Sequence, residues 1–478
     1  LWWGHRIPVF RCESCSHEWA AVESPDLCPI CASSNLQQDP DVLDTWFSSW
    51  LWPFSTLGWP REDDSYRYFH PTDVLVSGYD IIFFWIARMI MAGLKFTGKE
   101  PYHTVYITGM VKDELGRWMS KSLGNGIDPI EMIDQYGADA VRYSLVVLTT
   151  EGQDIKLAPS RFEMGRNFAN KLWNAARFLL MQNKPVSFTL QAPPSLRLED
   201  RWILSRLQIM LAVVEDRVSR YKLNEALLAI YDFTWHDYCD WYVELIKPRL
   251  LNEADAADGE GTLALALRIF ETALRALHPF MPFVTEELWQ QVAALPGLDV
   301  GVSGFRSIMR QQYPVSDPAQ IDPEAETKMN LLQEVIQVVR NIRSEMEVPP
   351  RAEAALFVSG DESAISILFE QMGMLRTLAR VRSLHQTTAK PPHSASAAVQ
   401  SLELFVPLEG LIDLSIERAR LEREIARQEN LLTGIQQKLN NTSFVEKALS
   451  EIVERERQKL INVEESLTKL RKNRANLD

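Results

Sequence analysis

The chain has 478 residues, of which 46% are hydrophobic and 24% are charged. This composition is ordinary for a folded globular protein and excludes a mainly disordered or low-complexity chain. At about 150 residues per domain, the length predicts about three domains. Fifty Lys and Arg against 64 Asp and Glu give a net charge of −14. That charge excludes a wholly basic nucleic-acid-binding protein, but it does not exclude a local basic face.

Neither a membrane protein nor a secreted disulfide scaffold fits the sequence. The most apolar stretch, residues 81–94, is too short to span a bilayer and contains Arg88. No signal peptide is visible, and five cysteines are few for a chain of this length, so we expect a cytoplasmic protein. Because the chain begins at Leu1 in a run typical of a domain interior, we also expect it to be truncated at its N-terminus.

Four of the five cysteines form two pairs with the spacing of metal ligands. Two residues separate Cys12 from Cys15 and Cys28 from Cys31, and twelve residues lie between the pairs. Four thiolates in two such turns can complete a tetrahedron around Zn²⁺, which leaves no open position for catalysis. The spacing predicts a structural zinc ribbon within residues 1–50, and four thiols without metal are the alternative.

Residues 51–155 alternate β-branched runs with helical patterns. Strands are expected at 74–77 and 104–108, and helices at 80–94 and 129–148. This alternation predicts a parallel α/β sheet, in which ligands bind beyond the carboxyl ends of the strands.

Two short motifs in this region are candidates for nucleotide binding. Gly78 and Asp80 follow the first strand, where a carboxylate can accept ribose hydroxyls or bind a substrate ammonium; capping of the next helix by Asp80 is the alternative. A later loop offers one cation and two hydroxyls to a triphosphate, and it consists of Met119, Ser120, Lys121 and Ser122. Taken alone, four residues are a weak signal, and a solvated loop is the alternative.

A dense set of tryptophans surrounds these motifs: Trp46, Trp50, Trp52, Trp59 and Trp85. By default such residues form a core. A pocket for a small apolar side chain needs the same residue types, so composition does not separate the two interpretations.

Residues 156–324 have a helical pattern, with apolar-periodic segments at 161–181, 200–221, 223–245 and 263–277 that predict an all-α bundle. The first helix places four residues on one face, namely Arg166, Asn170, Trp173 and Arg177. Basic, amide and aromatic groups in this arrangement suit an RNA backbone and unstacked bases. A solvated basic face with Trp173 in the core is the alternative, and the local pattern alone favours it.

The C-terminal part has two further divisions. Residues 325–408 predict a small α/β subdomain with strands at 354–359 and 402–406 and a linker at 390–398. Residues 411–478 contain 13 basic and 12 acidic residues and two runs with a 4-3 apolar rhythm. Two such helices joined by a short turn predict an antiparallel coiled-coil hairpin with arms of about 26 residues.

Together these segments resemble the valyl-tRNA synthetases, a family of class I aminoacyl-tRNA synthetases. The similar motifs follow the family's order over nearly the whole chain, at residues 1–8, 39–49, 51–60, 78–85, 119–122 (the family's KMSKS loop), 166–174 and 411–478. The isoleucyl and leucyl relatives match these motifs less well. The resemblance implies the second half of a Rossmann-type catalytic domain with a zinc-ribbon insertion, an all-α anticodon-binding domain and a tRNA-binding hairpin.

The resemblance also implies an activity: ATP-dependent activation of L-valine to valyl-adenylate, with Mg²⁺ accompanying ATP, followed by transfer to tRNA(Val). It assigns Lys121, Ser120 and Ser122 to catalysis; Gly78, Asp80, Met119 and Lys121 to ATP or adenylate; and Trp46, Ile81 and Trp85 to the valine pocket. It assigns tRNA contacts to Arg166, Asn170, Lys171, Trp173, Arg177 and Phe178. A monomer is expected.

The sequence departs from the family in two places. Trp118 stands where the family's loop has Lys, with Arg117 as a partial replacement, and no His-x-Gly-His motif is present. Because that motif and the editing domain precede the similar region in the family, we expect a C-terminal fragment that is inactive alone. The alternatives are a non-catalytic tRNA-binding paralogue and an unrelated zinc-ribbon nucleic-acid-binding protein.

Overall fold

The computed structural model describes residues 4–120, 122–150, 152–182, 196–251, 255–295, 306–441 and 450–477. The chain packs into two compact units, one formed by Leu1–Ala169 and Val214–Leu228, the other by Asn170–Val213 and Ala229–Asp478. Within the described ranges, no helix has both the length and the apolar character needed to cross a membrane.

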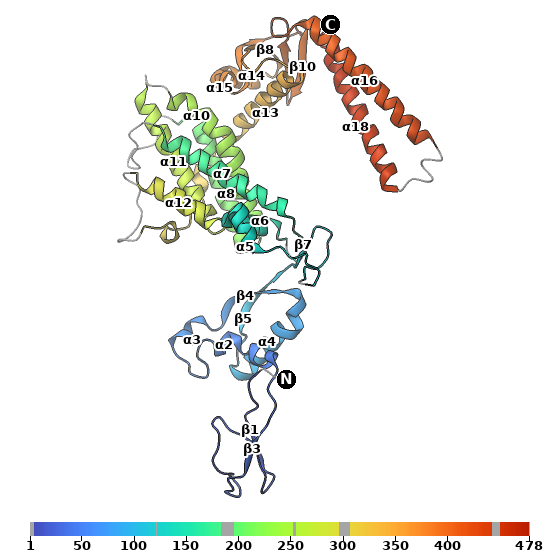
Figure 1. The fold of residues 1–478 in the computed structure, drawn as a ribbon. Coiled ribbons are helices and arrows are strands. Elements are labelled where there is room, and N and C mark those ends of the chain that lie inside the picture. The colour runs from blue at the N-terminus through green and yellow to red at the C-terminus, as the bar shows by residue number, and fades with distance from the viewer. Residues whose placement is uncertain are drawn as a thin grey trace. The chain divides into compact units, whose positions relative to one another are not determined.

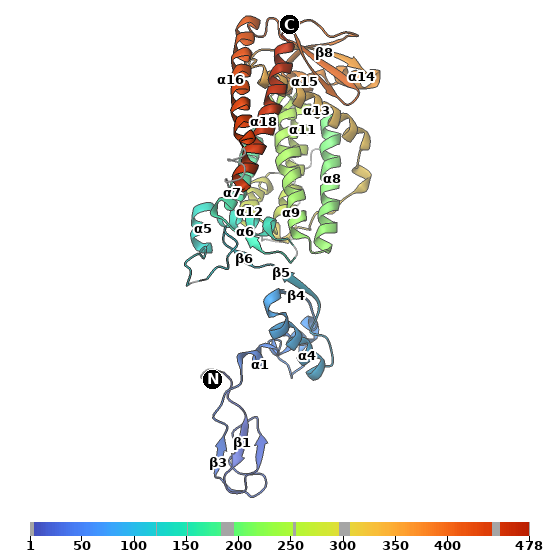
Figure 2. The same cartoon turned by 90° about the vertical axis from the view of Figure 1, so that its right-hand side faces the viewer.

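The first unit begins with a small antiparallel sheet in the order β2-β1-β3 (Figure 2). Its strands are β1 (Val9–Cys12), β2 (Glu18–Ala20) and β3 (Leu36–Gln38). Phe10 and Cys12 on the central strand are buried, whereas most of the surrounding residues are exposed. So little apolar burial cannot stabilise a fold of this size without a further cross-link.

The α/β part of this unit contains two parallel strands, which confirms the pairing expected from the sequence. β4 (Thr72–Gly78) and β5 (Tyr102–Thr108) pair in register over their whole length, so both carboxyl ends lie at one edge. The connection between them is a 3₁₀ turn, a π-helical segment and an α-helix, namely η1 (Tyr79–Ile81), η2 (Ile82–Ile86) and α4 (Ala87–Phe96). Three short helices precede β4: α1 (Thr45–Ser49), α2 (Trp52–Ser55) and α3 (Asp64–Phe69).

The single helix predicted at 129–148 is wrong in one respect, because the structure has two helices there. α5 (Pro129–Tyr136) and α6 (Ala138–Leu148) are separated by Gly137, whose φ of 92° is open to glycine and strained for other residues. The neighbouring strands β6 (Val111–Lys112) and β7 (Ile155–Lys156) form a second parallel pair.

The helical bundle predicted from the apolar periodicity is confirmed (Figure 1). Its elements are α7 (Phe162–Leu180), α8 (Leu198–Ser219), α9 (Leu223–Asp232), η4 (Phe233–Tyr242), α10 (Val243–Leu250), α11 (Ala256–Leu277) and α12 (Pro282–Ala293). Three single 3₁₀ turns flank them: η3 (Pro159–Arg161), η5 (Ile308–Arg310) and η6 (Pro318–Gln320). The core of the second unit contains fully buried large aromatic side chains, among them Trp202, Trp289, Tyr238 and Tyr242.

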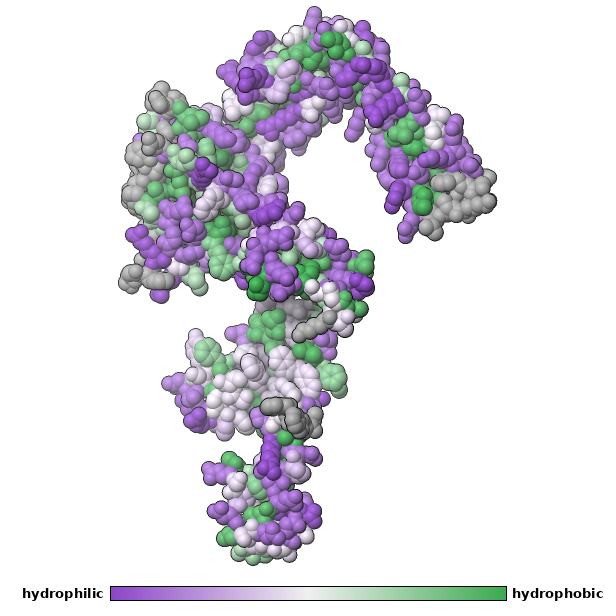
Figure 3. Space-filling view, viewed as in Figure 1, coloured by the Kyte–Doolittle hydropathy of each residue, from purple (hydrophilic) through white to green (hydrophobic). Residues whose placement is uncertain are grey.

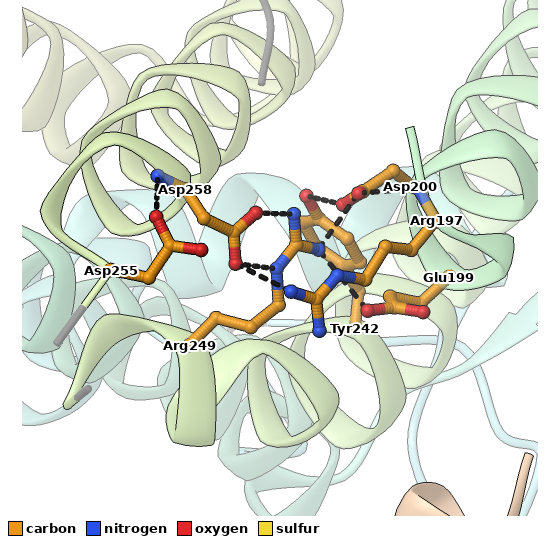
Figure 4. Close-up of polar contacts among 7 residues, drawn as sticks. All are labelled: Arg197, Glu199, Asp200, Tyr242, Arg249, Asp255 and Asp258. Atoms are coloured by element: carbon orange, nitrogen blue, oxygen red, sulfur yellow. Dashed lines mark hydrogen bonds and ion pairs between the residues drawn. The ribbon is translucent and has the colours of Figure 1, made fainter. Parts of the chain in front are cut away.

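A buried ion cluster joins α8, α10 and α11 (Figure 4). The Arg249 guanidinium, only 4% exposed, pairs with Asp200 at 2.7 Å, Asp258 at 2.8 Å and Glu199 at 3.1 Å. The Tyr242 hydroxyl donates to the other oxygen of Asp200 at 3.0 Å. Burial lowers the pKa of Arg249, but the surrounding carboxylates more than offset that effect and hold the pKa above its ordinary value.

The region after the bundle is a four-stranded sheet in the order β10-β11-β8-β9, with three helices. The elements are α13 (Pro323–Glu345), β8 (Ala354–Gly360), α14 (Glu362–Glu370), α15 (Met372–Ala379), β9 (Val381–Gln386), β10 (Ser394–Val399) and β11 (Leu402–Pro407). The linker predicted at 390–398 is wrong, since most of it belongs to β10. Small residues such as Ala395 resemble a loop in sequence, yet they form a strand because they pair with β11 and pack against α13.

Helices α16 (Leu414–Asn440) and α18 (Ser450–Ala475) lie side by side (Figures 1 and 2). Cross-pairs of Glu422 with Arg474 and Glu429 with Arg471 show that they run antiparallel. Their shared core contains Ile435, Val463 and Leu467, while the outer surface is mainly hydrophilic (Figure 3). The predicted turn at 440–443 falls partly outside the described residues.

Candidate active site and metal centre

The four paired cysteines converge at one end of the sheet β2-β1-β3. Their sulfur atoms all lie within 4.8 Å of one another, with Cys12 Sγ 3.5 Å from Cys31 Sγ and Cys15 Sγ 3.6 Å from Cys28 Sγ. A tetrahedron with metal–sulfur bonds of about 2.3 Å has sulfur–sulfur edges of about 3.8 Å. The donor set therefore fits a tetrahedral thiolate-bound metal ion with no coordination position left for substrate.

The backbone of each cysteine turn has the same shape. The amide of Ser16 donates to the carbonyl of Cys12 at 2.8 Å, and the amide of Ala32 donates to the carbonyl of Cys28 at 3.0 Å. Both donors have a left-handed backbone, with φ of 58° and 57°. Burial raises the pKa of the Cys12 thiol, but nearby amides lower it more, so that its pKa is about 6. In the same cluster the amide of His17 lowers the pKa of Cys15, but the neighbouring thiols raise it more, to about 12, so the thiols do not all favour the thiolate form without a metal ion.

The Gly78–Asp80 segment lies at the carboxyl end of β4, as the sequence predicts. A Cβ at position 78 would lie 2.6 Å from Asp80 Oδ1, so Asp80 occupies the space that a side chain on residue 78 would need. The helical start at this point has Gly78 as its N-cap and no side-chain capping bond. The alternative role of Asp80 as a helix cap is therefore wrong, and its exposed carboxylate is oriented by close packing against Gly78.

The loop after β6 is organised around Asp113 and Asn125. Asp113 accepts bonds from the amides of Leu115 and Arg117, from Arg117 Nε at 2.8 Å and from Asn125 Nδ2 at 2.9 Å. Asn125 Oδ1 in turn accepts from the amide of Ser120 at 3.0 Å. The Asp113 carboxylate and the Asn125 side-chain amide thus fix the backbone around the segment 119–122.

These bonds make the loop sensitive to acid. The hydrogen bond from Asn125, together with Arg117, lowers the pKa of Asp113 to about 2 despite its burial. Because the folded pKa is depressed, the stabilisation is complete above the ordinary value of 3.8 and is lost as the pH falls through about 2. We expect Asp113→Asn to reproduce the acid form at neutral pH, with faster hydrogen exchange at Leu115, Arg117 and Ser120. Unchanged exchange at these three amides would contradict the role of Asp113.

The motif residues themselves lie on this scaffold. The hydroxyls of Ser120 and Ser122 are 3.1 Å apart, and Ser120 Oγ also accepts from the amide of Leu123 at 3.2 Å. Met119 packs against a small buried cluster formed by Val141, Leu157 and Phe162. Lys121, the central residue of the prediction, lies outside the described residues.

A second polar cluster lies beside the loop. Asp154 accepts from Lys112 Nζ at 2.7 Å, from the Tyr79 hydroxyl at 3.1 Å and from the amide of Met110 at 3.0 Å. The hydrogen bond from Lys112 lowers the pKa of Asp154, and the same bond raises the pKa of Lys112. The Lys112 ammonium also lies 4.6 Å from the ring centre of Trp118. Trp118 therefore contacts a cation from β6, while Arg117 is held by Asp113.

A mainly apolar groove of about 420 Å³ lies near α1 and α4, and Trp46 lines it. The other lining residues are Asp44, Phe47, Trp50, Phe83, Ala87, Arg88 and Met91. Trp85 donates from its indole to the carbonyl of Ser49 at 3.1 Å and packs against the buried residues Ile86 and Met89. Ile81 is half-buried, and neither it nor Trp85 lines this groove.

Helix α7 presents the predicted basic face. Trp173 is 43% exposed, so the alternative that placed it in the core is wrong. Asn170 and Arg177 are also exposed, whereas the Arg166 guanidinium lies 5.7 Å from the ring centre of Tyr136. Two further predicted tRNA contacts have partners within the protein. Lys171 pairs with Asp240 and lies over Trp235, and the ring of Phe178 lies 5.4 Å from Lys247 Nζ.

The sequence interpretation missed four residues that organise the candidate active site: Lys112, Asp113, Asn125 and Asp154. Each belongs to an ordinary polar turn in the sequence. The sequence offered one indication of these residues: Asn125 lies between Gly124 and Gly126, shortly after the candidate loop 119–122.

Three family models match the chain in succession. The class I tRNA synthetase model (I, L, M and V) matches residues 1–158, the anticodon-binding domain of tRNA ligase matches 200–358, and the valyl tRNA synthetase tRNA binding arm matches 413–478. A ternary complex of Agrobacterium radiobacter K84 LeuRS with tRNA and LeuAMS aligns with 84% of this chain and 49% of that chain. Its TM-score is 0.51 at 20% identity, which shows a shared fold alone.

Curated relatives named valine–tRNA ligase match almost the whole chain. The enzymes of Petrotoga mobilis and Thermotoga maritima are 41% and 43% identical over 98% of this chain, and that of Symbiobacterium thermophilum is 44% identical over 96%. The chain spans about half the length of these relatives, 52–53%. The match of three successive models and of these relatives shows that the chain belongs to the valyl-tRNA synthetase family of class I tRNA synthetases.

Proposed function

We propose that this chain contributes one side of the catalytic site and the tRNA-binding surfaces of a valine–tRNA ligase, which activates L-valine with ATP and Mg²⁺ and transfers it to tRNA(Val). The observation that carries this proposal is the order of three family models along one chain, the last of them specific to valyl enzymes. The relatives are named as ligases, which does not favour a non-catalytic paralogue. We propose five functional divisions: the zinc ribbon and the start of the catalytic half at 1–50, the Rossmann-type catalytic half at 51–155, and the helical anticodon-binding domain at 156–324. A small α/β subdomain at 325–408 and the tRNA-binding hairpin at 411–478 follow.

In the proposed activation step, a carboxylate oxygen of valine attacks the α-phosphorus of ATP, and pyrophosphate leaves. Such catalysis depends on positioning and on stabilisation of the developing phosphate charge. Gly78 and Asp80 would hold the ribose hydroxyls or the valine ammonium at the end of β4. Ser120, Ser122 and Lys121 would contact the phosphates from the loop, with Met119 anchoring that loop to the protein.

Lys112 is one of the cations next to this loop in the part of the chain that the structure describes, together with Arg117 and Lys156. Its position over Trp118 and against Asp154 supports a role for Lys112 beside the triphosphate, where the family's loop has an additional Lys. Arg117 is a second candidate for that role, since each cation has one carboxylate partner: Arg117 Nε donates to Asp113 at 2.8 Å and Lys112 Nζ to Asp154 at 2.7 Å.

The proposed valine pocket combines Trp46, Ile81 and Trp85. The groove beside Trp46 is large enough for an isopropyl group and mainly apolar. The bond from Trp85 to Ser49 ties Trp85 to α1, which carries Trp46, while Ile81 and Trp85 themselves lie outside the lining of this groove.

Two surfaces are proposed for tRNA. On α7, the exposed Trp173 offers a stacking platform between Arg166, Asn170 and Arg177, while Lys171 and Phe178 support it through their internal contacts. On the coiled-coil hairpin, carboxylates pair with several of the arginines, namely Arg420, Arg427, Arg471 and Arg474. The other basic residues of the hairpin would therefore contact the phosphates.

We also propose that Cys12, Cys15, Cys28 and Cys31 hold a structural Zn²⁺ in a zinc ribbon. The closed donor set supports a purely structural role, in which the ion replaces the missing hydrophobic core of β2-β1-β3.

The proposed function predicts that the chain binds tRNA but forms no adenylate alone. We expect valine tRNA to bind at least tenfold more tightly than a tRNA with an unrelated anticodon, in a filter-binding assay. Valine-dependent pyrophosphate exchange should stay at background, since loss of even one donor to a transition state costs about 10²–10³ in rate. Equal affinity for both tRNAs would contradict the assignment to valine, and exchange above background would contradict the proposed incomplete site.

A further inference from the structure

Five exposed arginines lie at one corner of the region formed by α13, α15 and the strands β8 and β9. We call this surface the arginine corner, and it consists of Arg340, Arg351, Arg376, Arg380 and Arg382. The family models leave most of it unassigned, because one ends at residue 358 and the next begins at 413.

The fold gathers these residues from separate elements. Arg340 on α13 donates from Nε to the carbonyl of Leu378 near the end of α15, at 2.7 Å. Arg380 follows α15 directly, and its carbonyl accepts from the amide of Ala354, the first residue of β8, at 2.9 Å. Arg351 lies three residues before Ala354, and Arg382 lies two residues after Arg380.

The acidic residues nearest the arginine corner in sequence, Glu347 and Glu353, form no ion pair with it in the described parts of the chain, and others lie farther away. Asp361 and Glu362 follow the other end of β8, which is seven residues long, so they lie about 23 Å from the Ala354 end where the arginine corner lies. Glu347 pairs with Arg420 of α16. Glu353 is a carboxylate in the same turn as Arg351, and it forms no ion pair with the arginine corner in the described parts of the chain.

Four arginines of the corner have no ion-pair partner among the described residues. In the residues that the structure describes, no carboxylate lies within ion-pair distance of Arg351, Arg376, Arg380 or Arg382. Behind them lies Arg343, only 8% exposed, whose Nη2 donates to the carbonyl of Pro349 and whose Nη1 has no partner. Burial and the nearby charge of Arg380 lower the pKa of Arg343. In the described part of the chain, these like charges therefore lie near one another without a direct ion pair.

Arg380 also has an unusual backbone conformation. Its φ of 56° and ψ of 39° place it in the left-handed region at the C-terminus of α15. Glycine is the usual residue at this position, because a Cβ is strained there. Glycine can therefore replace Arg380 without backbone strain, so Arg380→Gly tests the charge of the side chain.

We propose that the arginine corner binds the phosphate backbone of RNA. The inference rests on the proposed function, which makes tRNA the RNA in question. Guanidinium groups bind phosphate oxygens in pairs of hydrogen bonds, and such contacts position an RNA without reading its sequence. A protein of net charge −14 needs such a local surface to approach a polyanion.

The test compares tRNA affinity and its salt dependence for the whole chain and four variants. Arg380→Gly and the triple variant Arg351→Gln, Arg380→Gly, Arg382→Gln remove charge from the corner. Gln400→Gly is the matched control, since Gln400 also has a left-handed backbone, with φ of 50°, in the turn between β10 and β11. Glu353→Gln removes the neighbouring negative charge.

We expect Arg380→Gly to bind valine tRNA roughly threefold to tenfold more weakly, with the slope of log K against log salt reduced by about one. The triple variant should lose about three units of slope, and Glu353→Gln should bind somewhat more tightly. Gln400→Gly should leave binding unchanged. Arg380→Gly should melt at the same temperature as the wild type or slightly above it, which separates weaker binding from poorer folding.

The outcomes distinguish this inference from the function on which it rests. If the unmodified chain binds no tRNA, the proposed function itself fails. If the unmodified chain binds tRNA and the triple variant binds it with the same affinity and slope, the arginine corner is not an RNA surface. Loss of binding to polyglutamate in that variant, with unchanged tRNA affinity, would assign the corner to an acidic protein and overturn the proposal.

Discussion

Replacing Cys28 and Cys31 by Ser should abolish metal binding and unfold the sheet β2-β1-β3, while the helical bundle stays folded. The sheet contains three short strands and few buried side chains, so its folding depends on the bound ion. Structural Zn²⁺ in small domains contributes about 10–16 kcal/mol at neutral pH, far more than a core of this size supplies. Metal analysis should give one Zn²⁺ per unmodified chain and none for the variant.

The fifth cysteine supplies the control. Cys239 is buried in the helical bundle, 6% exposed, and lies in the other compact unit. Cys239→Ala should retain the full metal content and protease resistance of residues 5–42. Metal retained in the Cys28, Cys31 variant, or lost in the Cys239 variant, would contradict the assignment.

The second large effect is expected at Arg249. Arg249→Met removes the cation that contacts all three carboxylates of the cluster, those of the buried Glu199 and Asp200 and of the partly buried Asp258. Breaking a buried ion pair from one side leaves uncompensated charge and costs about 3–5 kcal/mol. The free energy of unfolding of the bundle, measured by urea titration of tryptophan fluorescence, should fall by about that amount.

A control within the same cluster is available. Arg197 also pairs with Asp258 at 2.8 Å, but its side chain is 50% exposed. Arg197→Met should cost at most about 1 kcal/mol, as exposed ion pairs do. Adding Asp200→Asn and Asp258→Asn to Arg249→Met should recover part of the lost stability, because the remaining buried charge is smaller. An equal loss in the free energy of unfolding for Arg249→Met and Arg197→Met would show that the contribution of these ion pairs to stability does not depend on their burial.

Sequence reasoning reached those features that local spacing and periodicity decide. The spacing of Cys12, Cys15, Cys28 and Cys31 predicts a metal cluster because two close pairs can meet around one ion. The apolar period of about 3.6 residues predicts the bundle, and the paired β-branched runs predict β4 beside β5. The helical pair α16 and α18 follows from the same kind of pattern. The Gly78–Asp80 motif could be located from sequence because it directly follows a strand.

Other features depend on residues that are distant in sequence, and only the tertiary structure decided them. The sequence of β10 resembles a linker, and it forms a strand only because β11 and α13 bury its small residues. Helices α5 and α6 are separate because Gly137 has a positive φ, which the continuous apolar periodicity of residues 129–148 does not reveal. The exposure of Trp173 depends on which face of α7 the other helices cover. The hubs at Asp113 and Asp154 gather partners up to 75 residues apart, as the bond from Tyr79 to Asp154 shows. Whether the arginines of the corner have ion-pair partners likewise depends on where the fold places the carboxylates. The net charge of a segment does not specify which charged side chains lie next to each other.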